Sequence, residues 1–154
     1  ATVFKTQLGP LLNGWVNYET WVPDKKMMYE GTEEFFKKYQ SRAGAEGVDP
    51  LGYYLGGWGY AYIQVLGDAI KSTNSLKDDV LADYIRKTTF KTIHGNIKFG
   101  KGGEWEVGRM LQVQYHDIKQ GAGLDVFRGM SYQTVLTPSD LKTGELIYPY
   151  EKAK

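Results

Sequence analysis

The spacing of apolar residues in the first third of the chain predicts a strand followed by a helix. Apolar and aromatic residues are dense between Leu12 and Val22, and the breaker Pro23-Asp24 follows, which is typical of an extended segment. From about Lys25 to Arg42 the apolar positions recur every three or four residues among lysines and glutamates, so this segment is expected to form an amphipathic helix.

Two further helices are predicted beyond a glycine-rich connection. Residues 48–59 contain a proline and several glycines and are expected to form a loop or crossover. Residues Tyr60–Lys71 are apolar on nearly every face, which predicts a helix that is largely buried. Ser75 with Asp78 resembles a capping box, which would open a helix running to about Lys87.

The pattern changes to a period of two from Thr92 onward, which predicts strands. The alternation continues to Phe99, stops at a glycine-rich turn and returns between Leu111 and Tyr115, so two strands joined by a loop are expected there. A shorter strand pair is expected around Val126 and over residues 132–136. Residues 137–154 contain two prolines and are expected to form an irregular C-terminal tail.

Composition narrows the range of partners. The 154 residues are 42% hydrophobic and 24% charged, as in one ordinary globular domain. Lysine plus arginine total 19 and aspartate plus glutamate total 18, a balance that points away from nucleic acid and anionic membranes as partners. The chain has no cysteine, which excludes disulfides, thiolate catalysis and cysteine-ligated metal. No apolar run is long enough to cross a membrane and no signal-peptide pattern occurs, so we expect a soluble chain without its export signal.

Three patterns that have catalytic associations lack the context that each chemistry needs. Residues 95–101 begin like a phosphate-binding loop, but position 102 is a glycine where a hydroxyl is required, and a strand is predicted instead of a helix. His94 and His116 lie at polar strand positions, are expected to face solvent and lack a third metal ligand. Glu104 and Glu106 flank Trp105 in a turn, where neither carboxyl would gain the raised pKa that acid catalysis of sugar hydrolysis needs. We therefore expect neither an enzyme nor a bound cofactor or metal.

The stretch Gly56–Leu66, GGWGYAYIQVL, places three glycines beside three large aromatic residues. One interpretation is a turn followed by the start of a buried helix, because glycine reaches backbone conformations that other residues avoid. The other is a ligand site, in which the glycines leave room near the backbone and the aromatic rings form flat walls. The residues alone leave both interpretations open.

Four short motifs occur in an order that resembles a known protein family. The matching positions are Gly59, Tyr60, Gln64, Leu66, Ala69 and Ile70 on the buried helix; Arg86, Lys87, Phe90 and Thr92 after it; Gly95, Ile97, Phe99 and Gly103 on a strand; and Val113 with Gln114 on the next. Over about residues 8–120 the sequence resembles the C-terminal part of the type I periplasmic solute-binding proteins of ABC importers, the branched-chain amino-acid-binding group.

The resemblance implies a fold, a function and a site. The fold would be α/β, with residues 1–154 as the C-terminal portion of a ligand-binding domain that contributes to both lobes of a two-lobed protein. A small organic solute, such as a hydrophobic amino acid or a related carboxylate, including an aromatic one, would bind between the lobes and pass to the membrane permease of an ABC importer, in the periplasm or outside the cell. Carried onto this sequence, Tyr53, Tyr54 and Trp58 form the candidate ligand wall, and Tyr60 is a weaker candidate.

Two departures from the family change these expectations. Proteins of this family are much longer, so this chain is expected to be an incomplete portion whose partner is the missing N-terminal half of the parent chain or a second copy. Residues 3–14 contain no acid, although amino-acid binders of the group hold the ligand's α-amino group there. An unpaired buried ammonium is costly, so the ligand is expected to be a carboxylate or amide without an α-amino group. The alternatives are the ligand-binding domain of a sensor with the same fold and an aromatic-rich carbohydrate-binding module.

Overall fold

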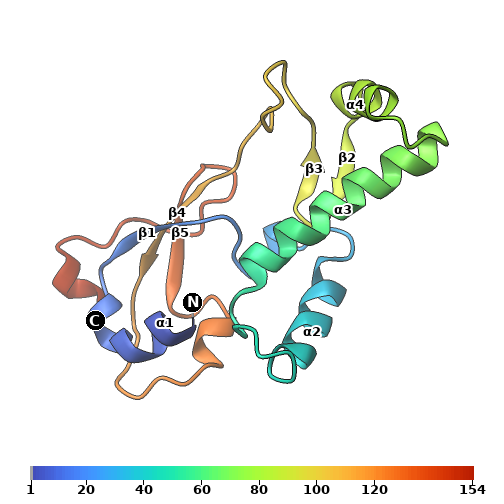
Figure 1. Ribbon diagram of the computed structural model, residues 1–154. Helices are drawn as coiled ribbons and strands as arrows, with labels where there is room; N and C mark the ends of the chain where they lie inside the picture. The colour runs from blue at the N-terminus through green and yellow to red at the C-terminus, as the bar shows by residue number, and fades with distance from the viewer. Residues whose placement is uncertain (1) are drawn as a thin grey trace.

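The computed structural model describes residues 2–154, apart from the side chains of residues 53 and 54. Over these residues the structure is mixed α/β, with four α-helices and two small antiparallel sheets, so the expected fold class is confirmed at this level. The elements form two groups (Figure 1). The sheet group holds α1 (Thr2–Leu8), β1 (Val16–Glu19), β4 (Leu111–Tyr115) and β5 (Gln133–Thr137). The helix group holds α2 (Thr32–Ala43), α3 (Tyr53–Thr73), α4 (Asp78–Lys87), β2 (Phe90–Thr92) and β3 (Gly95–Ile97).

The sheet group is built around β4, which pairs antiparallel with β1 on one side and β5 on the other. The predicted strand at 111–115 is therefore confirmed. Leu111, Val113 and Tyr115 are at most 1% exposed. On the opposite face Gln114 is also buried, because the C-terminal tail lies against it, whereas Gln112 is exposed. The predicted strand over residues 12–22 is shorter in the structure, since Leu12 ends a 3₁₀ turn and only Val16–Glu19 pairs with β4.

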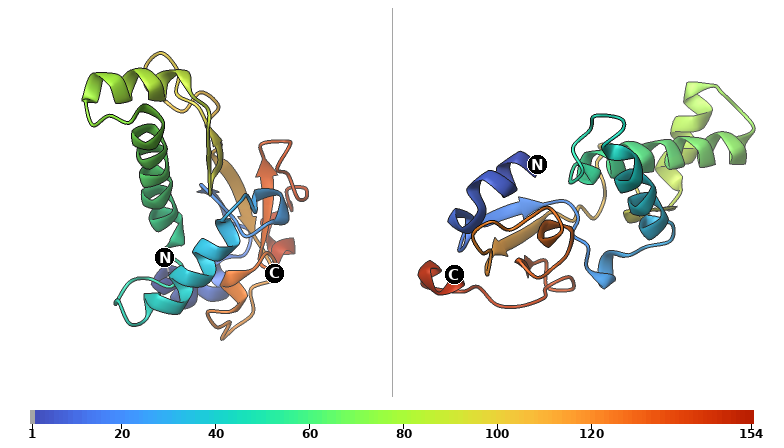
Figure 2. Two further views of the ribbon diagram at one scale, coloured as in Figure 1. Left: turned by 90° about the vertical axis from the view of Figure 1, so that its right-hand side faces the viewer. Right: turned by 90° about the horizontal axis from the view of Figure 1, so that it is seen from below.

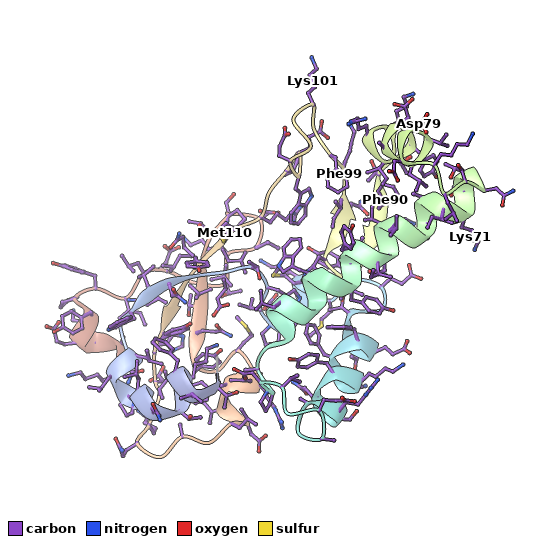
Figure 3. All side chains as sticks on the ribbon, in the orientation of Figure 1. Lys71, Asp79, Phe90, Phe99, Lys101 and Met110 are labelled. Atoms are coloured by element: carbon purple, nitrogen blue, oxygen red, sulfur yellow. The ribbon has the colours of Figure 1, made fainter. Side chains whose placement is uncertain are left out.

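Two connections join the groups, over residues 20–31 and 98–110, and the chain passes from one group to the other in each. Figure 2 shows the groups side by side, with α1 along the sheet and the long helix α3 on the far side of the junction. Lys101 marks the outer end of the second connection and points away from both groups (Figure 3).

Helix α2 begins later than its apolar period suggested. The predicted helix from Lys25 is interrupted, because Asp24 caps a separate 3₁₀ turn by accepting from the Lys26 amide at 2.9 Å. Gly31 then adopts a left-handed φ of 80°, a conformation that stops a helix from continuing through it. The helix starts at Thr32, whose buried hydroxyl donates to the Ile93 carbonyl at 2.7 Å.

Helix α3 begins at Tyr53, so the predicted loop is wrong over residues 53–59. The expectation that this helix is largely buried is also wrong. Its buried positions form one narrow stripe at four-residue intervals: Gly57, Ala61, Val65 and Ala69. Around that stripe Leu55, Tyr62 and Ile63 are 67%, 68% and 62% exposed, so α3 presents an open apolar face.

Helix α4 covers the predicted segment, but the expected capping box does not form. The Ser75 hydroxyl accepts from the Lys77 amide at 3.1 Å, ahead of the helix, and the side chain of the N-cap residue Lys77 makes no capping bond. The predicted strand from Thr92 to Phe99 is instead a hairpin, in which β2 pairs antiparallel with β3. The chain reverses at residues 93–94, and Gly95 follows with a φ of +89°. Strands β3 and β4 belong to different sheets, so the two expected strands do not pair with each other.

The C-terminal residues are largely irregular, as predicted, and lie against the sheet. Val126 begins a 3₁₀ turn instead of a strand, and β5 occupies part of the second expected segment. Residues beyond β5 form one further 3₁₀ turn at Tyr150–Ala153. The buried Gln114 side chain holds the tail by accepting from the Ile147 amide at 2.7 Å and donating to the Ile147 carbonyl at 3.0 Å.

Candidate functional site

Of the four residues expected at the ligand site, the structure describes the side chains of Trp58 and Tyr60 only. Tyr53 and Tyr54 lie in the first turn of α3, and their side chains fall outside the described part of the structure. Trp58 contacts His94 and Trp105, whereas Tyr60 contacts Phe35 on α2. Two residues apart on a helix differ by about 200° in direction. Trp58 and Tyr60 therefore face different neighbours.

Trp58 belongs to an aromatic cluster between α3, the hairpin and the second connection. Its ring stacks on His94 with centroids 4.4 Å apart and an interplanar angle of 17°. Trp105 meets it edge-on at 5.4 Å, and the Phe99–Trp105 bridge holds the connection in place. Beside the cluster is an apolar pocket of about 360 Å³, whose wall includes Trp58, Tyr62, Leu66, Ile97, Phe99 and Trp105.

The glycines beside Trp58 lie within the helix and allow rings to approach its backbone. A Cβ added at Gly57 would lie 2.8 Å from Nε2 of His94, and one at Gly56 would lie 3.0 Å from Cε2 of Tyr39. Both are closer than ordinary contacts between a methyl group and a ring. Packing thus explains Gly56 and Gly57, where an added Cβ would press on a neighbouring ring, but not Gly59, which has no atom within 4 Å of an added Cβ.

His94 is buried, so the expectation that it faces solvent is wrong. It is 5% exposed, and its Nε2 has no hydrogen-bond partner within the described residues. Burial lowers the pKa of His94 to about 4, and the Gly57 backbone offsets only part of that effect. The ring is therefore neutral at ordinary pH.

The other polar residues considered in the sequence contact neighbouring side chains. His116 follows β4, and its two ring nitrogens lie 2.8 Å from Asp117 and from Thr134. Glu106 pairs with Lys98 at 3.1 Å. Among residues 2–154, no group of three or more histidine, aspartate or glutamate side chains could hold a metal ion. None of the described helices is long and apolar enough to span a membrane.

A polar cavity of about 180 Å³ lies where the two groups meet, and we call it the junction cavity. Its wall includes Lys5 of α1, Glu19 of β1, Thr20, Leu51 ahead of α3, and Tyr132 and Gln133 at β5. The segment before α3 is joined to α1 near this cavity, because Asp49 accepts from the Thr2 amide at 2.9 Å and from the Thr2 hydroxyl. The first turn of α3, with Tyr53 and Tyr54, thus begins close to the cavity.

The charged groups of the junction cavity are paired with one another. Nζ of Lys5 donates to the Tyr132 hydroxyl at 2.7 Å and lies 3.7 Å from Oε1 of Glu19. The Tyr115 hydroxyl donates to the same Glu19 oxygen at 3.1 Å. Nζ of Lys5 also lies 5.0 Å from the centroid of the Tyr132 ring, which is a cation–π distance. Burial lowers the pKa of Lys5, and the Glu19 carboxylate offsets part of this effect.

Two residues of the wall each hold a buried side-chain oxygen that has no hydrogen-bond partner among the described residues. The oxygens are Oγ1 of Thr20 and Oε1 of Gln133. The Gln133 amide nitrogen donates to the Gly129 carbonyl at 3.3 Å, so the amide is fixed with its oxygen unpaired. Both atoms have almost no accessible surface, so they are buried behind the wall and do not face the cavity.

Sequence reasoning did not identify the junction cavity, and no local signal could have done so. Lys5 lies in a seven-residue helix, Glu19 and Gln133 lie at the ends of ordinary strands, and Thr20 directly follows β1. They meet only because β4 brings β1 and β5 together from opposite ends of the chain.

Comparison with known proteins does not assign the site to a family. Neither a scan against protein-family models nor a search of the curated proteins finds a match to this chain.

Proposed function

We propose that this chain is the C-terminal portion of a type I periplasmic solute-binding protein, which binds a small organic solute and delivers it to the membrane permease of an ABC importer. The observation that carries the proposal is the junction cavity, a polar site between two groups of elements that are joined by two connections. A binding protein of this kind closes two lobes around its solute, so its site must lie where the lobes meet. Leu51, which lies shortly before α3, borders that place, and the family resemblance expects the ligand wall to begin in this part of the chain.

The motif residues behind the resemblance support the proposal through their structural roles. Oε1 of Gln64 on α3 accepts from the Ile93 amide at 3.1 Å and so ties the helix to the hairpin. Gly95 has a φ of +89°, and a Cβ there would lie 2.9 Å from the Tyr29 ring. Gln114 fixes the C-terminal tail to β4. Because each position serves this architecture, a shared set of such residues favours a shared architecture.

The open apolar face of α3 supports the view that the chain is part of a larger assembly. Leu55, Tyr60, Tyr62 and Ile63 are each between 49% and 68% exposed on this one helix. Exposed apolar surface of this kind is normally covered in soluble proteins. In the proposed function the missing N-terminal half of the parent chain covers it, or a second copy does so. The protein then acts in the periplasm or outside the cell, where importers collect their solutes, and a sensor domain of the same fold would use the same site.

A solute panel tests the proposal. Thermal unfolding of the protein is followed with amino acids, short carboxylates, short carboxamides and sugars, each over a range of concentrations. A solute at a hundred times its Kd stabilises the folded state by about 2.7 kcal/mol. For a chain of this size that raises Tm by roughly 5–10 °C.

The control for the panel is the same titration with each solute on an unrelated protein, which removes general solvent effects. A saturable shift with one class of small organic solute is expected. A saturable shift with sugars alone would contradict the proposal and favour the carbohydrate-binding alternative. No saturable shift with any solute in the parent protein would contradict it outright.

A further inference from the structure

Lys5 places an amine-bearing side chain in the wall of the junction cavity. Its side chain is 10% exposed, and that of Glu19, which also lines the cavity, is 18% exposed. Burial lowers the pKa of Lys5 because the charged form loses its water, and the Glu19 carboxylate opposes this effect only in part. A group whose pKa is shifted both by burial and by a specific charge partner, in the wall of a cavity, is typical of a functional site.

The polar ends of three wall residues come together at this amine. Nζ of Lys5 donates to the Tyr132 hydroxyl at 2.7 Å, which fixes the position of the amine. Oε1 of Glu19 lies 3.7 Å from Nζ, so a small movement of either flexible side chain lets a proton pass between them. Lys5, Glu19 and Tyr132 all line the cavity, so a molecule that enters it lies beside an amine and its proton acceptor.

A desolvated lysine amine with a neighbouring acid–base group is the arrangement that forms a Schiff base with a carbonyl compound. Glu19 first accepts a proton from the Lys5 ammonium, and the neutral Nζ then attacks the carbonyl carbon. The new C–N bond forms as the electron pair of the C=O π bond moves to oxygen, and the attacking nitrogen gives a proton to that oxygen. Glu19 returns its proton to the resulting hydroxyl, which leaves as water, and a protonated imine remains on Nζ.

The reaction leaves the charges of the site unchanged. The protonated imine carries the single positive charge that the ammonium carried, so it keeps the ion pair with Glu19. An aldehyde or ketone brings no charge of its own, whereas a carboxylate would be repelled by Glu19 and an ammonium by Lys5. A cavity of about 150 Å³ accepts a ring of six carbon atoms. The junction cavity, at about 180 Å³, therefore has room for a small carbonyl compound.

We propose that Lys5 captures a small uncharged aldehyde or ketone in the junction cavity as a Schiff base. Glu19 transfers the proton, and Tyr132 holds the amine in position. One carbonyl compound is bound by each chain. The inference goes beyond the proposed function, because it concerns a covalent reaction of this cavity and holds whether or not the chain belongs to a solute-binding protein.

Reductive trapping with propanal tests this reaction. The full chain is treated at neutral pH with propanal and sodium cyanoborohydride, which reduces a protonated imine to a stable propylamine. Proteolysis and mass spectrometry then give the rate at which each lysine gains a propyl group. Lys101 is the internal reference, because it lies at the outer end of the second connection and points away from both groups (Figure 3). Lys5 is expected to react at least about tenfold faster than Lys101, because a positioned acid–base group assists its reaction.

Three variants and one control connect the reaction to the named groups. Lys5→Arg keeps the positive charge beside Glu19 but has no nucleophilic amine, so the fast propyl addition should disappear and not move to another lysine. Tyr132→Phe removes the hydroxyl that holds the amine, and Glu19→Gln removes the group that returns the proton to the leaving hydroxyl. Each is expected to slow the reaction of Lys5 about tenfold and leave that of Lys101 unchanged. Gln112→Leu, on the exposed side of β4, is the matched control and should leave both rates unchanged.

A measurement in urea keeps the test independent of how well the variants fold. Unfolding the unmodified protein should remove the difference between Lys5 and Lys101, because the advantage of Lys5 comes from the folded cavity. A Lys5 rate no higher than that of Lys101 in the folded protein would overturn the inference. So would a fast reaction of Lys5 that is undiminished in both Tyr132→Phe and Glu19→Gln.

The outcomes separate this inference from the proposed function. A solute of the panel that raises Tm saturably, in a protein whose Lys5 is unreactive, supports the proposed function and overturns the inference. A reactive Lys5 in a parent protein that responds to no solute of the panel supports the inference and contradicts the proposed function.

Discussion

Replacing Gly57 by alanine tests whether the glycines of α3 are present for packing. In an open helix interior the change from glycine to alanine stabilises a protein by about 1 kcal/mol, because alanine loses less backbone entropy on folding. At Gly57 the new Cβ would lie 2.8 Å from Nε2 and 3.3 Å from Cε1 of His94. The ring has little freedom to move away, since it is 5% exposed and stacked on Trp58.

Overpacking of this kind costs about 1–3 kcal/mol. Gly59 lies two residues further along the same helix, is exposed and has no atom within 4 Å of an added Cβ. Gly59→Ala gains the same helix propensity without the contact, so it is the matched control. The propensity gain cancels between the two variants. Gly57→Ala is therefore expected to be less stable than Gly59→Ala by the overpacking cost itself, about 1–3 kcal/mol.

Urea unfolding of both variants, followed by circular dichroism, measures this difference. Near Tm it corresponds to roughly 2–12 °C for a chain of this length. A double-mutant cycle adds a second check, because His94→Ala removes the ring and should make Gly57→Ala harmless. Equal stabilities of Gly57→Ala and Gly59→Ala would show that His94 does not press on the helix backbone, and the packing explanation of the glycines would be wrong.

Two further predictions follow from buried polar side chains. The folded pKa of His94, about 4, lies below its ordinary value of 6.5. The unfolded chain therefore binds the proton first as pH falls, so stability is full above about pH 6.5 and decreases toward pH 4 by about 3 kcal/mol. Urea unfolding across this pH range measures the loss of stability. The His94→Phe variant should show a weaker dependence of stability on pH. If its stability fell as steeply with pH as that of the unmodified protein, His94 would not be the cause of the pH dependence. The Gln114 side chain bonds to Ile147 and, at 3.2 Å, to the Gly14 carbonyl. Gln114→Leu leaves these buried backbone groups without a hydrogen-bond partner and is expected to lower the free energy of unfolding by about 2–4 kcal/mol. Hydrogen exchange at the Ile147 amide should also accelerate, whereas the exposed control Gln112→Leu should change neither quantity; unaltered exchange in Gln114→Leu would show that the tail is held by other contacts.

The spacing of apolar residues predicted those helices and strands whose tertiary contacts agree with the local conformational preference of the sequence. The apolar period of α4 and the alternation of β4 specify a helix and a strand without help from distant residues, and both elements lie where the sequence placed them. The start of α3 was missed because glycine disfavours helices. Contacts with Tyr39 and His94 from other elements offset that preference.

The sequence by itself determined the α/β composition, the balanced charge and most of the elements, because periodicity and composition act over neighbouring residues. Only the tertiary structure decided which face of α3 is buried, that His94 is enclosed, and that Lys5, Glu19, Thr20 and Gln133 share one cavity. The physical reason is strand pairing: β4 joins β1 and β5 across nearly the whole length of the chain. Contacts of that kind depend on how distant segments fit together, and no window of neighbouring residues contains them.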